Sequence, residues 1–437
     1  MLTYYLELAL RAMRSHRGLT ALMLLSIAMG VAACMTTLTV FHVMSGDPIP
    51  GKSGRLFNVQ LDAESKRDWK PGDEPELQLT RFDAEQLLRA RRAVHQVIMT
   101  GSFIAVDPAG SGDASLPPFF TGGRWTTADF FTMFEAPFRY GNGWTAADDT
   151  AEARVAVISA ELNDKLFGGQ DSRGKTVRLR DKDFTVVGVL KPFRPAPHYY
   201  DLTLGAYAKA ADVYIPLSTS LSLRFGAAGN MSCWGRTDGV DPRSANVPCA
   251  WLQYWVQLDT PEEADDYRRY LVNYSDQQRA AGRFQRPTNV RLRDVMEWLD
   301  FNQVVPGDVR LQVWLALGFL LVCLTNTVGL LLAKFLRRSS EIGVRRALGA
   351  SRRAIFAQCL VEAGTVGLAG GVLGLGLATL GLWAVRQQPA SYAELAKLDP
   401  TMLVLTIVIA IGASLLAGVL PAWRACQVTP AIQLKSQ

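Results

Sequence analysis

A glycine-rich segment at residues 168–176 is the first candidate for chemistry in this sequence. It reads GGQDSRGKT, and its Gly169-x4-Gly174-Lys175-Thr176 spacing satisfies the phosphate-binding P-loop pattern. That loop needs a strand before it and a helix after it, because glycine amides and a helix N-terminus together bind the phosphates. The residues that follow, VRLRDKDFTVVGVL (177–190), alternate and are β-rich, which predicts a hairpin instead. We therefore interpret the segment as a turn between a helix and a hairpin.

Few residues are available for metal or thiol chemistry. The chain has four histidines and six cysteines without a CxxC pair, so no metal site is expected. Four cysteines lie in or beside apolar segments, where a thiol is usually a small apolar side chain: Cys34, Cys323, Cys359 and Cys426. Cys233 and Cys249 enclose a short loop rich in Gly, Asp and Pro, and in an oxidising compartment we predict a disulfide between them. Two free thiols are the alternative.

Four apolar segments are each long enough to span a bilayer, because a hydrocarbon core about 30 Å thick requires roughly 20 helical residues. They lie near residues 19–44, 311–333, 354–385 and 401–423, and Glu362 interrupts the third. The first also resembles a lipoprotein signal ending at Cys34. However, apolar sequence continues for about ten residues beyond that cysteine, which favours a complete span.

Basic residues gather at the edges of these segments. Three arginines precede the first span, seven Lys or Arg residues lie between 334 and 353, and Arg424 and Lys435 follow the fourth. This asymmetry predicts that both termini and the 336–353 loop are cytoplasmic. The net charge of +6 is spread along membrane edges rather than over one folded face, so nucleic-acid binding is not expected.

The predicted fold is a membrane α-helical bundle of four transmembrane helices with a mixed α+β extracytoplasmic domain inserted between helices 1 and 2. The predicted parts are a cytoplasmic amphipathic helix (1–17), helix 1 (18–44), the inserted domain (45–310), helix 2 (311–335), a cytoplasmic loop (336–353), helix 3 (354–385), an outer loop (386–400), helix 4 (401–424) and a cytoplasmic tail (425–437). The alternative for residues 1–17 is a simple cytosolic extension of the first span.

Within the inserted domain, strand patterns occur at 56–61, 97–106, 154–158, 176–180, 184–190, 212–217 and 251–258, and helical patterns at 80–92, 159–167 and 261–279. Residues 192–250 are rich in Pro, Gly, Ser and Tyr and predict loops or a subdomain.

The 336–353 loop is the segment best suited to bind a partner. One side of a short predicted helix is apolar and consists of Ile342, Val344, Ala347 and Leu348. Its other faces have Glu341, Arg345 and Arg346, and Gly349 is placed to end it. Such a helix suits insertion into a groove on a cytosolic protein. A basic loop that only fixes topology is the alternative.

The third span contains two glycine pairs four residues apart, Gly367/Gly371 and Gly370/Gly374. Small residues at this spacing let another helix approach closely. We expect the neighbour to belong to the same subunit, with a dimer interface as the alternative. Glu362 is costly in lipid and is expected to make a polar contact near the cytoplasmic edge, because no acidic or histidine partner for a proton relay is visible.

Several segments resemble the MacB/FtsX superfamily of ABC-transporter permeases. LSIAMGVAA (25–33) is similar to the family's first span, EIGVRRALGASRRAIFAQCLVEAGTVGLAGGVLGLGLA (341–378) to its loop and third span, and LPAWRACQVTPAIQLK (420–435) to its C-terminal ending. GRWTTADFF (123–131), RVAVISAELNDKLFGG (154–169) and GKTVRLRDKDFTVVGVL (174–190) resemble its periplasmic core, so that 45–310 is identified as a MacB-like domain. Residues 192–310 mostly depart from the family's pattern.

The resemblance implies a multi-pass permease of the bacterial inner membrane, dimeric with a second copy or a sister permease. A separate ABC ATPase would bind the coupling helix at Glu341, Ile342, Val344, Arg345, Arg346 and Leu348. That subunit would hold ATP and Mg, so no cofactor and no catalytic residue are expected in this chain, which is not expected to contain an ATPase domain.

Relatives transmit ATP-driven movement to their periplasmic domains, which is called mechanotransmission. We expect export of a periplasmic substrate, with a periplasmic adaptor protein and membrane lipids as further partners. Lipoprotein extraction and control of wall hydrolases remain open. Two other classes compete: a membrane receptor or structural protein without an ATPase, and an NTPase that uses the 169–176 motif.

Overall fold

The apolar segments form four long helices: α2 (Arg17–Ser45), α10 (Gly307–Arg337), α12 (Arg352–Arg386) and α13 (Pro400–Cys426). The computed structural model describes residues 17–67, 69–111, 116–237, 239–388 and 400–427, together with 5, 7–9, 11, 13 and 392. Within these ranges, the four helices are the ones long and apolar enough to cross a membrane. The predicted fold class, with an α+β domain between the first and second helices, is confirmed.

Helix α10 begins earlier than the predicted residue 311. Pro306 stands at its N-cap, and Asp308 lies in the first turn, where a carboxylate meets the positive end of the helix dipole. Three predicted segments lie largely outside the described residues: the 1–17 helix, the 386–400 loop and the 425–437 tail.

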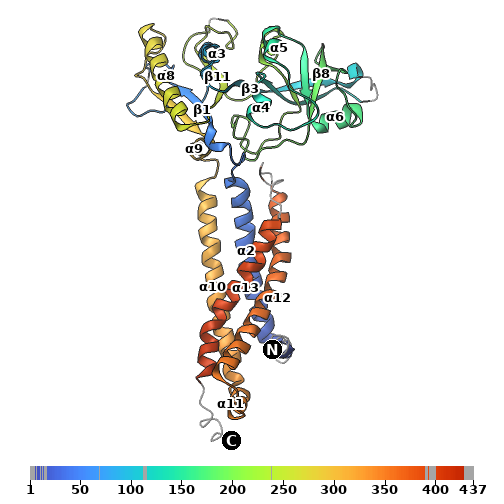
Figure 1. The fold of residues 1–437 in the computed structure, drawn as a ribbon, viewed down its shortest axis with the longest axis vertical. Helices are drawn as coiled ribbons and strands as arrows, with labels where there is room; N and C mark the ends of the chain where they lie inside the picture. The colour runs from blue at the N-terminus through green and yellow to red at the C-terminus, as the bar shows by residue number, and fades with distance from the viewer. Residues whose placement is uncertain are drawn as a thin grey trace. The chain divides into compact units, whose positions relative to one another are not determined.

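The chain divides into two compact units, Gly46–Val304 and the remainder, Met1–Ser45 with Val305–Gln437. In the second unit, α2 and α13 each contact both α10 and α12, as Figure 1 shows. The helices share one apolar core, to which α2 contributes Met23, Ile27 and Val31. Each span is thus packed on at least two of the others, while large apolar side chains on its outward side are exposed, as on a lipid-facing surface.

Glycines on two faces of α12 let its neighbours approach closely. Gly367 and Gly371 face α13, where an added Cβ would lie only 2.4 Å and 2.7 Å from side-chain carbons. Gly370 and Gly374 face α2, where an added Cβ would lie 2.9 Å and 3.1 Å from the nearest atoms. The two pairs therefore pack against two different helices of the same chain.

The strands of the described residues form one 12-stranded sheet in the Gly46–Val304 domain. They are β1 (Leu56–Leu61), β2 (Leu79–Thr80), β3 (His95–Asp107), β4 (Phe119–Thr126), β5 (Phe138–Gly141), β6 (Val155–Ile158), β7 (Thr176–Leu179), β8 (Lys182–Leu190), β9 (Val213–Pro216), β10 (Ser232–Cys233), β11 (Cys249–Gln257) and β12 (Val290–Asp294). The main path is β12-β1-β11-β3-β4-β9-β6-β8-β5, with β2 and β10 paired to β11, and β7 to β3 and β8. Most neighbours are antiparallel, while β4–β9 and β6–β8 are parallel.

Most helices of this domain begin after a residue whose side chain accepts a hydrogen bond from a free amide of the first turn. The helices are α3 (Arg81–Ala90), α4 (Phe130–Met133), α5 (Ala146–Thr150), α6 (Ala160–Phe167), α7 (Leu217–Ser222), α8 (Pro261–Ala280) and α9 (Val295–Phe301), with 3-10 turns at Ser53–Arg55 and Pro108–Ser111. The side chains of Thr80, Ser159 and Thr260 accept hydrogen bonds from the amides of the first turns of α3, α6 and α8. In Figure 1, α3, α8 and α9 lie near β1 and β11, whereas α5 and α6 lie near β8.

Part of the region predicted to be loops is deeply buried. Tyr199, Tyr200 and Asp201 are at most 1% exposed, and the Asp201 carboxylate forms an ion pair with the equally buried Arg124 of β4. The Trp255 indole donates to the Tyr200 carbonyl at 3.0 Å. Burial lowers the pKa of the neighbouring His198 to about 3, so that this imidazole is neutral. Residues 198–201 are therefore a core segment without regular secondary structure.

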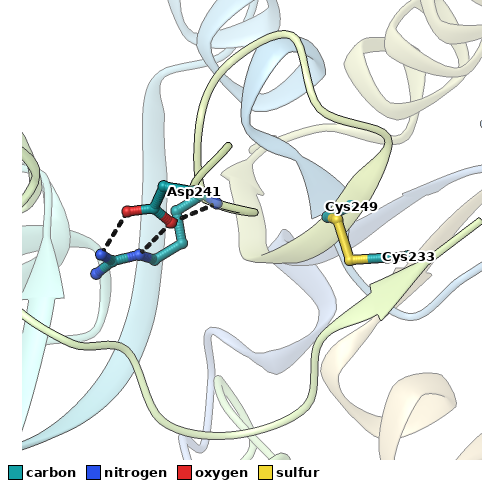
Figure 2. Close-up of a disulfide and its surroundings, with 4 residues drawn as sticks. Cys233, Asp241 and Cys249 are labelled. Carbon is teal, nitrogen blue, oxygen red and sulfur yellow. Dashed lines mark hydrogen bonds and ion pairs between the residues drawn. A yellow bond between two sulfur atoms is a disulfide. The ribbon is translucent and has the colours of Figure 1, made fainter. Parts of the chain in front are cut away.

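Cys233 and Cys249 face each other on the antiparallel pair β10–β11 and are joined by a disulfide, shown in Figure 2. Their Cα atoms lie 4.1 Å apart. The loop between them holds Asp241, whose pKa the Arg243 guanidinium keeps at about 2 through an ion pair of 2.7 Å.

Alkylation under denaturing, non-reducing conditions is expected to modify four thiols, because Cys233 and Cys249 are blocked. Replacing both by serine is expected to lower the free energy of unfolding by about 3 kcal/mol in the chain-entropy model, given their sequence separation of 16. Mass spectrometry and chemical denaturation measure the two effects. Six alkylated thiols without reductant would refute the disulfide.

Candidate functional site

A short helix, α11 (Ser339–Ala347), occupies the loop between α10 and α12. It ends before Gly349, whose φ of +99° lies in the region that favours glycine. Ser351 then caps α12 by accepting a hydrogen bond from the Ala354 amide at 3.2 Å. Figure 1 shows α11 at the end of the helix bundle where α13 also ends.

The charged residues of α11 are bound to the adjoining helices. Glu341 pairs with Arg345 at 3.1 Å and with Arg338, just after α10, at 3.0 Å. Arg345 also donates to Gln358 Oε1 on α12 at 3.1 Å, and Arg346 to the Cys426 carbonyl of α13 at 3.3 Å. These polar contacts join α11 to α10, α12 and α13.

The sequence predicts that Ile342, Val344, Ala347 and Leu348 line one side of the helix. In the structure these four residues do not share one side. Ile342 is half-buried and packs on the bundle core, whereas Val344 is 56% and Leu348 82% exposed. Residues two apart point in nearly opposite directions on an α-helix, while residues four apart share a face. That prediction is therefore wrong for Ile342. The exposed apolar side consists of Val344, Ala347 and Leu348.

Glu362 of α12 lies beside this helix and is paired twice. Its Oε1 is 2.7 Å from Lys334 Nζ of α10, and its Oε2 is 3.2 Å from Arg338 Nη1. The Lys334 side chain is fully buried, and that of Glu362 is 3% exposed. The sequence-based prediction placed Lys334 at the end of helix 2, counted it among the basic residues at the membrane edge, and missed this pair. The apolar Phe335 and Leu336 that follow it are the signal that α10 continues past the lysine.

Among the residues that the structure describes, no group of three His, Cys, Asp or Glu side chains is placed to hold a metal ion.

Two family models match the chain in succession. The MacB-like periplasmic core domain matches residues 20–274, which is more than half of the chain, and the FtsX-like permease C-terminal region matches residues 313–430. The chain belongs to the MacB/FtsX family of ABC transporter permeases.

Relatives of this permease differ in length. The macrolide export ATP-binding/permease protein MacB of Azoarcus sp. is 25% identical over 440 residues, covering 98% of this chain and 59% of the relative. The MacB protein of Syntrophobacter fumaroxidans is 26% identical over 341 residues, covering 71% and 46%. The chain thus spans roughly half of the MacB relatives' length. An uncharacterized ABC transporter permease, YvrN of Bacillus subtilis, is 22% identical over 441 residues and covers 99% of both chains.

Among solved structures, the periplasmic region of MacB from Actinobacillus actinomycetemcomitans is 14% identical with a TM-score of 0.36. The match covers 59% of this permease and 96% of that chain.

The P-loop-like segment of the permease is a turn. α6 ends at Phe167, Gly169 has a φ of +77°, and β7 begins at Thr176 and pairs with β8. The Ser172 hydroxyl donates to Asn163 Oδ1 at 2.6 Å, which ties the turn to α6. Lys175 Nζ lies 5.2 Å from the centroid of the Phe167 ring. The predicted turn between a helix and a hairpin is confirmed, and no helix N-terminus follows the glycines.

Lys175→Ala is expected to leave ATP hydrolysis by the assembled transporter unchanged, because only a cation–π contact worth about 0.5–1 kcal/mol is lost. ATP turnover of the purified complex measures this. Lys182→Ala, which removes another lysine of the same hairpin, is the matched control. A large loss confined to Lys175→Ala, with assembly intact, would reveal a nucleotide site in the turn.

Proposed function

We propose that this chain is the membrane subunit of an exporter in which a separate ABC ATPase binds α11 and drives movement of the Gly46–Val304 domain. ATP and Mg are held by that ATPase, and the chain itself does no catalysis. The permease works as a dimer, with a second copy or a sister permease, in the bacterial inner membrane. Both termini and α11 are cytoplasmic, and a periplasmic adaptor protein assists the export of a periplasmic substrate.

The exposure of one side of α11 is the observation that supports this proposal most directly. Val344 and Leu348 are exposed on a helix whose charged residues are turned back onto the bundle. Neither side chain contributes to the apolar core of the spans. An apolar helix face bordered by fixed charges fits a hydrophobic groove on a protein partner. The MacB relatives are named ATP-binding/permease proteins, which agrees with an ATPase as that partner.

Co-expression with an ABC ATPase of the same organism, sought first among the neighbouring genes, tests the proposal. We expect the two proteins to co-purify, and the permease in lipid nanodiscs to stimulate ATP hydrolysis by that ATPase. Leu348→Glu is expected to abolish both effects, since it places a charge in the apolar contact, whereas Leu336→Glu on the exposed side of α10 leaves binding intact. Wild-type permease that neither binds nor stimulates the ATPase would refute the proposed function.

The proposed orientation has a test of its own. In a variant without the four free cysteines, Ala280→Cys at the exposed end of α8 is expected to react with a membrane-impermeant maleimide in spheroplasts. Ser340→Cys, exposed on α11, is expected to react only after permeabilisation, because the basic residues around it favour the cytoplasmic side. Labelling of Ser340→Cys in intact spheroplasts would contradict this topology.

A further inference from the structure

A continuous chain of charged side chains connects α11 with the interior of the bundle. It runs from Glu341 through Arg338 to Glu362 and ends at Lys334. Arg338 donates to both oxygens of Glu341, at 3.0–3.2 Å, and its Nη1 donates to Glu362 Oε2 at 3.2 Å. One guanidinium therefore holds a carboxylate of α11 and a carboxylate of α12 at the same time.

The inner end of this series of ion pairs is fixed by burial. Lys334 and Glu362 lie 2.7 Å apart and are almost inaccessible to solvent. In such a place each charge is stable only beside the other, because an isolated charge would lose its hydration without compensation. Beside Glu362, the side chains of Arg338, Glu341 and their neighbours leave a cavity of only about 20 Å³, so these side chains have little room to rearrange.

The covalent link between α11 and α12 is a weaker constraint. It passes through Gly349, whose left-handed backbone and missing side chain make it a permissive joint. By contrast, the planar guanidinium of Arg338 has a fixed geometry and binds carboxylates in defined orientations. A displacement of Glu341 must therefore change the position of Arg338 relative to Glu362 or move α12 with it.

We propose that Glu362 is the positioning residue through which movement of α11 reaches the transmembrane helices α10 and α12. Lys334 holds the carboxylate in place on α10, and Arg338 connects it to Glu341. The proposal rests on the proposed function, because it requires the ATPase to move α11. It adds a specific route: the ATPase acts on the spans through a buried carboxylate rather than through the loop backbone.

The test uses the full-length permease with its ATPase in lipid nanodiscs. Arg338→Gln and Glu362→Gln are each expected to lower the permease-stimulated kcat for ATP hydrolysis by roughly tenfold, since a buried charge contact is lost. The KM for ATP and co-purification should stay unchanged, because the exposed side of α11 is untouched. The double variant should be no more impaired than the more impaired of the two single variants, because both substitutions interrupt the same series of ion pairs. Glu362→Asp, which keeps the charge, should restore part of the stimulation.

Arg337→Gln is the matched control, since this exposed arginine lies next to Arg338 at the end of α10 and should have no effect. Should Glu362→Gln fail to accumulate in the membrane, Arg338→Gln decides the matter, because it leaves the Lys334–Glu362 pair intact. Normal stimulation by Arg338→Gln, or losses that multiply in the double variant, would overturn the proposal. Both outcomes require wild-type stimulation, so they differ from a failure of the proposed function, in which the wild-type permease itself does not stimulate the ATPase.

Discussion

Replacing Glu341 by lysine is expected to lower permease-stimulated ATP hydrolysis by at least roughly tenfold and to abolish transport. The new ammonium would stand between Arg338 and Arg345, which now approach the Glu341 carboxylate at 3.0 Å and 3.1 Å. Like-charge repulsion would also weaken the contact with the ATPase, where each loss of about 1.4 kcal/mol lowers a rate or binding constant tenfold. The three cations would separate, and α11 would lose its orientation toward the ATPase.

The same variant should still enter the membrane at normal levels. Glu341 is 45% exposed, and ion pairs at such positions contribute only about 0–1 kcal/mol to folding. Ser340→Lys is the matched control, because it adds the same charge at the neighbouring exposed position without breaking an ion pair. A loop that only fixes topology predicts no effect from either substitution. Normal ATPase binding, stimulation and transport in Glu341→Lys would exclude the coupling role of α11.

Asp201→Asn is expected to destabilise the Gly46–Val304 domain by about 3–5 kcal/mol, because it leaves the Arg124 guanidinium buried without a countercharge. The Asp201 carboxylate also accepts hydrogen bonds from Thr203 Oγ1 at 2.6 Å and Gln253 Nε2 at 3.0 Å, so several contacts depend on its charge. Chemical denaturation of the full-length protein, followed by tryptophan fluorescence, measures the loss.

Asp171→Asn provides the comparison, since Asp171 pairs with Arg173 at 2.7 Å but is 39% exposed, so that its loss should change stability little. Arg124→Met combined with Asp201→Asn should be less destabilising than Asp201→Asn alone, because no unpaired charge remains buried. Equal stability of the Asp201→Asn and Asp171→Asn variants would show that the buried pair does not stabilise the domain.

The Asp201–Arg124 pair also predicts how stability depends on pH. Burial opposes ionisation of Asp201, but the Arg124 guanidinium and the Thr203 hydroxyl together lower its pKa below the ordinary value. Because the folded pKa is lower than the unfolded one, the stabilisation is present above about pH 4 and is lost as the pH falls through the folded pKa.

Elements with strong local patterns could be predicted from the sequence. The alternating run at 56–61 is β1 with those same bounds, and Ser159 and Thr260 mark the starts of α6 and α8 as N-caps do. β4 was missed because Gly122 and Gly123 interrupt its apolar alternation. β12 was missed because three of the five residues in its sequence, VRLRD, are charged, which suits a strand that ends the sheet path.

The charged contacts of the candidate site could be predicted only where both partners are close in sequence. Glu341 and Arg345 are four apart on one helix, and their contact follows from that spacing. The pairs Lys334–Glu362 and Arg124–Asp201 join distant segments, so no local pattern indicates them. Asp201 also lies in a stretch whose composition is typical of surface loops, although tertiary packing buries it.

The glycine faces of α12 set a limit on how this sequence can vary. At Gly367 and Gly371 even a methyl group would collide with α13, and at Gly370 and Gly374 it would crowd α2. At Gly376, on the same helix, an added Cβ meets nothing within 4 Å. In a saturation mutagenesis screen, Gly367 and Gly371 should therefore tolerate no residue other than glycine, and Gly370 and Gly374 should disfavour larger residues, while Gly376 accepts alanine, serine and larger apolar residues. The pattern of tolerated codons along α12 would then report which of its faces is inside the bundle.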